Sequence, residues 1–98
     1  MDIKKIENNA EHLVNLLKAL SNERRLAIVC ALYAGEKCVG DLEDIVGLSQ
    51  SALSQHLARL RRDGLVTTRR DAQTIYYALH RPVTEKLLRG LADVAGER

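Results

Sequence analysis

The 98-residue sequence has no Phe or Trp, a single Pro and only two Cys. Because Tyr33, Tyr76 and Tyr77 are its only aromatic residues, the core must be built from aliphatic side chains. No apolar run approaches the roughly 18 residues that a membrane-spanning helix needs, and the first residues lack the apolar segment of a secretion signal. Two Cys without such a signal predict a cytoplasmic protein whose thiols are reduced at rest.

The residue sets of common enzymes are also missing. We find no Ser/His/Asp constellation, no phosphate-binding Gly loop and no closed set of metal ligands, so neither an enzyme nor a cofactor is expected. The length predicts one domain, residues 1–98. A chain this short buries a small core, which favours the presence of a second subunit.

Charge is unevenly distributed, although the net charge is only +2. Residues 59–71 contain five Arg and two Asp, a local charge of +3, whereas residues 35–48 contain four acidic residues and one Lys, a local charge of −3. A basic cluster of this kind is typical of phosphate contact. A solvated surface run is the alternative.

The stretch 41–64 predicts two helices joined by a tight turn at Gly47, with Ser49 as the N-cap of the second helix. Residues four and three positions apart give that helix one buried face: Leu53, Leu57 and Leu60, with Ile45 and Leu48 packing beneath them. Its opposite face carries short hydrogen-bonding side chains suited to a DNA major groove: Gln50, Ser51, Ser54 and Gln55.

Three further helices are expected: residues 3–20, residues 22 to about 34, and a last helix from Pro82. Apolar residues of the first recur at heptad spacing, which indicates either a dimer interface shared with the last helix or an ordinary core-facing stripe. Residues 26–34 are apolar on every side, so this helix should be central and buried. Arg24 and Arg25 precede that segment, placed for a phosphate or for an ion pair with the acidic helix.

Alternating side chains then predict a β-hairpin formed by residues 66–70 and 74–79, and residues 37–39 look like a short edge strand. A hairpin directly after a recognition helix forms a wing. Its tip, with Arg69, Arg70 and Gln73, could lie along a minor groove or the flanking phosphates.

Taken together, these features resemble the ArsR/SmtB family of winged-helix repressors over nearly the whole chain. The resemblance is carried by NERRL, by VGDL with LSQSALSQHLARLRRDGLV, and by RRDAQTIYY. It is greatest for the branch of nodulation regulators, virulence regulators and persulfide-sensing repressors. It implies a mainly α (α+β) winged helix-turn-helix, with the hairpin between the fourth and fifth helices. It also implies a homodimer through the terminal helices that represses promoters by binding inverted repeats in double-stranded DNA.

The resemblance further implies roles for individual residues. Four match base-facing positions: Gln50, Ser51, Ser54 and Gln55. Five match phosphate-facing positions: Ser49, Arg59, Arg62, Arg69 and Arg70. His56, at the edge of the buried stripe, is expected to be a hydrogen-bonded structural residue rather than a base contact.

The effector is left open. Only Cys38 remains of the family's thiolate metal site, and one Cys cannot close such a site. The family's second metal site is replaced by Arg81, Val83 and Val94, so no metal is predicted.

Cys30 matches one of the two Cys of the persulfide sensors. The alternatives are a response to a small sulfur or oxidant species through Cys30 and Cys38, a constitutive repressor with structural thiols, a metal-responsive repressor and, more remotely, a winged helix that binds protein or RNA. A bridge between the two thiols needs Cα atoms within about 7 Å.

Overall fold

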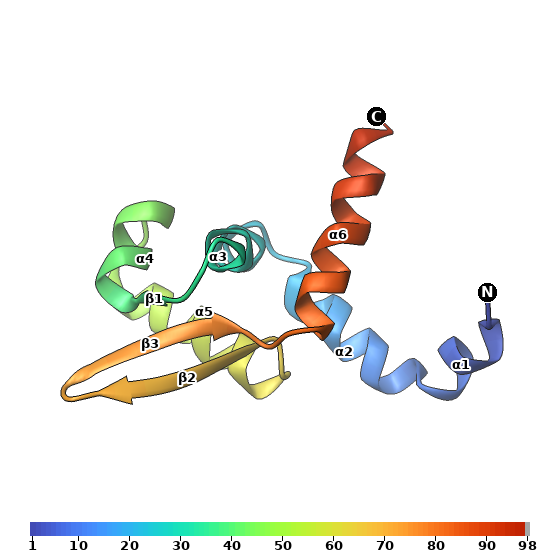
Figure 1. Cartoon of the computed structure of the whole chain (residues 1–98), viewed down its shortest axis with the longest axis horizontal. Coiled ribbons are helices and arrows are strands. Elements are labelled where there is room, and N and C mark those ends of the chain that lie inside the picture. Colours follow the sequence, from blue (N-terminus) through green and yellow to red (C-terminus); the bar gives the residue numbers. More distant parts are fainter. Residues whose placement is uncertain (98) are drawn as a thin grey trace.

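The computed structural model describes residues 1–97, in which a small antiparallel sheet lies along one edge of a group of helices (Figure 1). The elements in chain order are α1 (Ile3–Asn8), α2 (Ala10–Leu20), α3 (Glu23–Tyr33), β1 (Lys37–Cys38), α4 (Val39–Val46), α5 (Gln50–Arg62), β2 (Val66–Asp71), β3 (Thr74–Leu79) and α6 (Val83–Gly96). The sheet order is β1-β3-β2. The terminal helices α1, α2 and α6 gather at one end of the molecule, and α4 and the hairpin tip lie at the other.

The helix predicted for residues 3–20 is in fact two helices that meet at Asn9. The side-chain amide of Asn9 donates to the carbonyl oxygen of Lys5 at 2.7 Å, and its backbone leaves the helical region at φ −115° and ψ 21°. An Asn side chain that bonds a neighbouring backbone carbonyl competes with the helix in this way. The expectation of one uninterrupted helix was therefore wrong: α1 has no buried residue, and only α2 reaches the core.

Helix α3 runs through the centre of the fold, and Ile28, Val29 and Leu32 are fully buried on one side of it. The predicted central position is confirmed, but the prediction that the apolar segment 26–34 is buried holds for one side of the helix only. Cys30 is exposed, and Tyr33 keeps 44% of its surface. The apolar residues on the outer side of α3 therefore form part of the molecular surface.

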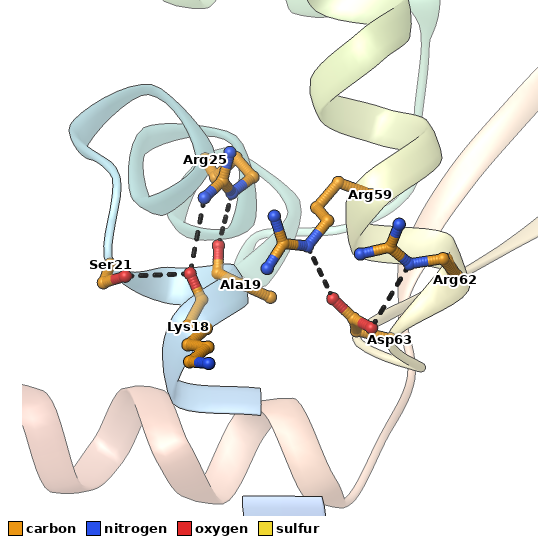
Figure 2. Close-up of polar contacts among 7 residues, drawn as sticks. All are labelled: Lys18, Ala19, Ser21, Arg25, Arg59, Arg62 and Asp63. Atoms are coloured by element: carbon orange, nitrogen blue, oxygen red, sulfur yellow. Dashed lines mark hydrogen bonds and ion pairs between the residues drawn. The ribbon is translucent and has the colours of Figure 1, made fainter. Parts of the chain in front are cut away.

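The start of α3 is fixed by Asn22, whose side-chain oxygen accepts from the backbone N–H groups of Arg24 and Arg25 at 2.9 and 3.1 Å. Arg25 turns back to the end of α2, where Nε donates to the Ala19 carbonyl at 2.5 Å and Nη2 to the Lys18 carbonyl at 3.3 Å (Figure 2). Arg25 thus satisfies helix-end carbonyls and makes no ion pair with the acidic helix, which was one of the two roles expected for it.

The helix-turn-helix forms as predicted. Gly47 adopts the left-handed conformation (φ 70°) that ends α4, and the Ser49 hydroxyl accepts from the Ala52 N–H at 3.2 Å to cap α5. Three Leu residues of α5 are fully buried: Leu53, Leu57 and Leu60. Leu48 packs against the core as expected, but Ile45 does not, because 54% of its surface is exposed.

The end of α5 is locked to the wing. Gly64 (φ 79°) donates to the Arg61 carbonyl at 3.1 Å, and Leu65 donates to the Leu60 carbonyl at 2.9 Å, with both Leu side chains buried. The buried hydroxyl of Thr84 in α6 donates to the Leu65 carbonyl at 2.7 Å. The chain therefore leaves α5 in one fixed direction, and α6 is anchored at the same point.

The predicted hairpin and edge strand are confirmed. β2 and β3 pair from Val66 with Leu79 to Asp71 with Thr74, so the turn consists of residues 72–73, and β1 pairs Cys38 with Tyr76. Side chains of paired residues share one face of a sheet, and successive residues alternate between faces. The face with Val66 and Leu79 covers the core.

Candidate nucleic-acid interface

The four side chains predicted to face bases all lie on the exposed side of α5: Gln50, Ser51, Ser54 and Gln55. They are three and four positions apart, opposite the buried Leu residues, so they share one face of the helix. Their amides and hydroxyls make no hydrogen bond to any part of the chain that the structure describes. The Ser49 hydroxyl accepts as the cap of α5, and its own proton is free to donate. The arrangement presents unused donors and acceptors on a rigid helix.

At the other end of α5, two Arg residues converge on Asp63 (Figure 2). Arg59 Nε lies 2.8 Å from one carboxylate oxygen and Arg62 Nε 3.5 Å from the other. The hydrogen bond from Arg59 is the main reason that the pKa of Asp63 lies below its ordinary value, with Arg62 adding to it. Asp63 therefore orients both cations, while Arg62 stays 68% exposed.

The lowered pKa of Asp63 predicts a pH-dependent contribution to stability. That contribution is fully present above about pH 3.8, the ordinary value, and is lost as the pH falls through the lower folded-state value. Asp63→Asn should reduce the free energy of unfolding by roughly 1 kcal/mol at neutral pH, because it removes the ion pairs. Urea unfolding of both proteins should show this difference shrinking in strong acid. A difference that stays constant with pH would assign the effect to another cause.

The Arg residues of the wing occupy opposite faces of the hairpin. Arg70 is exposed beside the turn and makes no ion pair or hydrogen bond with residues 1–97, and Gln73 is exposed within the turn. Arg69 is on the other face, and its guanidinium bonds the carboxylate of Glu36. The sequence places these two Arg in one group, and the structure separates them.

His56 is half-buried near the start of α3. Burial is the main cause that lowers its pKa, and the charges of Arg25 and Arg24 add to the effect. Its ring makes no hydrogen bond to any described residue, so the expected hydrogen-bonded role is wrong. A neutral, partly packed His is consistent with a residue at the edge of the core.

Sequence reasoning missed the two carboxylates that organise the Arg residues. Asp63 follows Arg59 by four positions, a helical spacing that favours ion pairing and was available as a signal. Glu36 and Arg69 are 33 positions apart, and no local pattern connects them. Only the folded sheet brings that pair together.

An apolar surface with two grooves runs along α2, α3 and α6, and no residue of α5 lines either groove. One groove of about 790 Å³ lies between α3 and α6 and includes Cys30 and Tyr33; a neighbouring groove of about 520 Å³ reaches α2 and includes Leu17. Leu91 and Val94 line both grooves. Large apolar residues stay exposed along this surface: Val14, Leu17, Tyr33, Leu91 and Val94. A contiguous apolar surface of this kind marks an interaction site.

The two thiols are far from equivalent in their surroundings. Cys30 is exposed at the α3–α6 groove, whereas Cys38 is half-buried in β1, and both are free rather than bridged. Among residues 1–97, no three or more His, Cys, Asp or Glu side chains lie close enough to hold a metal ion. Within the same part of the chain, no helix is long and apolar enough to span a membrane.

Sequence comparison with known proteins matches this chain to bacterial regulators of transcription. Residues 22–68 match the model of the bacterial regulatory protein, arsR family. The transcriptional activator HlyU of Vibrio cholerae is 57% identical over 79 residues, which span 81% of this chain and 73% of HlyU. The nodulation protein NolR of Rhizobium meliloti is 49% identical over 89 residues, 91% of this chain and 73% of NolR.

Solved structures agree with these sequence matches. That of HlyU from Vibrio cholerae superposes with a TM-score of 0.84 at 51% identity, covering 90% of this chain and 96% of HlyU. A domain from Mycobacterium bovis, described as a homodimeric winged helix-turn-helix DNA-binding domain, superposes with a TM-score of 0.86 at 29% identity. The match covers 99% of this chain and 89% of that domain.

Proposed function

The chain belongs to the arsR family of bacterial regulatory proteins and is a DNA-binding regulator of transcription, and we propose that it binds inverted-repeat operators as a homodimer and represses by occupying them. The observation that carries this proposal is the exposed polar face of α5, whose Gln and Ser side chains have no partner within the described chain. Such side chains can read base edges in a major groove.

The proposed dimer follows from the position of the apolar surface. The grooves of this surface are lined by residues of α2, α3 and α6 and by none of α5, so a second copy seated there would leave both recognition helices free. The domain from Mycobacterium bovis is homodimeric by its description, which supports the same assembly here. Two α5 helices related by a twofold axis would enter successive major grooves, about 34 Å apart.

In the proposed complex, phosphates are held at both ends of α5 and at the wing. Ser49 donates at the start of the helix, Arg59 and Arg62 lie at its end, and Arg70 and Gln73 extend from the hairpin. Phosphate contacts set the register of the helix on the duplex, and base contacts supply specificity.

The proposal is tested by selecting duplexes from a random pool and measuring their affinity at physiological salt. Selected duplexes should contain inverted repeats and bind at least about 10³-fold more tightly than unselected DNA. Analytical ultracentrifugation should show two chains per duplex. A flat preference among sequences would refute operator binding, and a single chain per operator would refute the dimer.

The exposed thiol of Cys30 supports a response to a small sulfur or oxidant species. It lines the groove where the partner subunit is proposed to sit, so an added sulfur or oxygen would disturb that contact. Treatment with a persulfide donor should lower the DNA affinity of the wild type and leave a Cys30→Ser variant unaffected. Mass spectrometry would identify the modified thiol. Modification without loss of DNA affinity would refute this response and favour a constitutive repressor. Cys38→Ser is the matched control for the second thiol.

A further inference from the structure

Arg69 extends across the sheet instead of outward from the wing. It belongs to β2, its guanidinium carbon lies 4.4 Å from the ring centre of Tyr76 in β3, and its Nε donates to both oxygens of Glu36 at 2.9 and 3.1 Å. Nη2 donates to the same carboxylate at 2.5 Å. Because the strand order is β1-β3-β2 and Glu36 immediately precedes β1, this side chain bridges the two edges of the sheet over its central strand.

The part of the hairpin that Arg69 crosses has little other support. Val66 and Leu79 pack on the core, but every residue from 69 to 75 is exposed. The distal hairpin is therefore held by its own strand pairing, and a two-stranded ribbon alone is marginally stable in water. The contact with Glu36 connects this distal part to the segment that follows α3.

The charges of the pair are mutually satisfied. Hydrogen bonding from Arg69 is the main cause that lowers the pKa of Glu36, and the same bond raises the pKa of Arg69. Both groups stay ionised near neutral pH. An exposed ion pair contributes little to overall stability, but a bidentate pair with a stacked guanidinium restricts geometry more strongly than a single contact.

We propose that Arg69 is a positioning residue and not a phosphate ligand: clamped between Tyr76 and Glu36, it sets the angle at which the wing carries Arg70 and Gln73 to DNA. The inference rests on the proposed function, because it assumes that the wing lies against the duplex. It assigns different roles to the neighbouring residues Arg69 and Arg70. Arg70, on the opposite face and without a partner among the described residues, is the cation that meets phosphate.

The two possible roles of Arg69 predict opposite effects of Glu36→Gln. If Arg69 were a phosphate ligand restrained by Glu36, removing the carboxylate would free the cation and raise DNA affinity. If Arg69 is a positioning residue, the same change loosens the wing and lowers affinity, by about fivefold for an exposed pair at the upper end of its range. Asp44→Asn is the matched control, since it removes an exposed carboxylate that makes no ion pair in the described chain.

The salt dependence of binding separates the roles independently. Operator duplexes selected by the wild type are titrated at several salt concentrations with Glu36→Gln, Arg69→Lys, Arg69→Gln and Arg70→Gln. Arg70→Gln should reduce the slope of log affinity against log salt by about 1 per subunit, as the loss of a phosphate contact requires. Glu36→Gln and both Arg69 variants should lower affinity with the slope unchanged, since Lys keeps the charge but neither stacks nor bonds in two places.

Rescue completes the test. A Glu36→Arg/Arg69→Glu exchange should recover part of the affinity lost in either single change, whereas a phosphate ligand would not be restored by moving its charge to residue 36. A higher affinity for Glu36→Gln relative to Asp44→Asn, or a reduced slope for Arg69→Gln, would overturn the inference. Failure of the wild type to select any duplex would instead refute the proposed function. Thermal unfolding of each variant shows whether it is folded.

Discussion

Replacing Leu91 with Glu is expected to leave the protein as single chains and to reduce its affinity for an inverted-repeat operator by about 10²-fold or more. Leu91 lines both grooves of the apolar surface, between α3 and α6 and between α2 and α6, and 43% of its surface is exposed in the single chain. In the proposed dimer that exposed part is covered by the partner subunit.

The size of the effect follows from two steps. Enclosing an unpaired carboxylate in an apolar contact costs several kcal/mol, which is enough to dissociate an interface between small subunits. A single chain then binds one half-site only and loses the gain from joining two binding events, which ranges from 10² to 10⁴ in roughly comparable linked systems. Because Leu91 is already at the surface of the single chain, the fold itself should tolerate Glu there.

Ile45→Glu is the matched control for this experiment. Ile45 is also an exposed apolar residue, at 54%, but it lies on α4 outside both grooves. Sedimentation should find the dimer retained in Ile45→Glu and lost in Leu91→Glu. If Leu91→Glu sediments as the wild type does, the subunit contact lies elsewhere on the chain.

The helix-turn-helix and the wing were predictable because their signals are local. The spacing of Leu53, Leu57 and Leu60, the Gly at position 47 and the period-two pattern of the hairpin each depend on a few neighbouring residues. Exposure of the base-facing residues followed directly, since a helix with one buried face must expose the other. The structure agrees with these elements to within one or two residues.

The side-chain partners of the candidate site were not predictable in the same way. Arg25 bonds the carbonyls at the end of α2, and Arg69 bonds Glu36, because folding brings these groups together from separate elements. A basic cluster in a sequence therefore overstates the number of free cations. The break at Asn9 was not predicted for a different reason. The heptad pattern continues through Asn9, and the spacing of apolar residues does not reveal that the Asn side chain bonds the backbone of Lys5.

Gln55→Ala is expected to relax the base preference at one position of each operator half-site, with a loss of discrimination of about 1–3 kcal/mol there. Gln55 is exposed on the free face of α5, one turn beyond the Ser51 position. Its amide offers both a donor and an acceptor, the pair that a purine edge can receive in the major groove. Selection from a random pool by the variant should recover the same repeat with that position degenerate.

Arg70→Ala provides the contrast that makes this prediction specific. Loss of a phosphate contact should weaken every duplex similarly and flatten the salt dependence, without changing which base is preferred at any position. Gln55→Ala should instead change the base preference and leave the salt dependence as it is in the wild type, since an uncharged side chain releases no counterions from DNA. If the two variants changed preference and salt dependence alike, α5 and the wing would not divide reading and clamping between them. A variant pair that separates cleanly would assign base recognition to the polar face of α5, whose side chains are left unpartnered within residues 1–97.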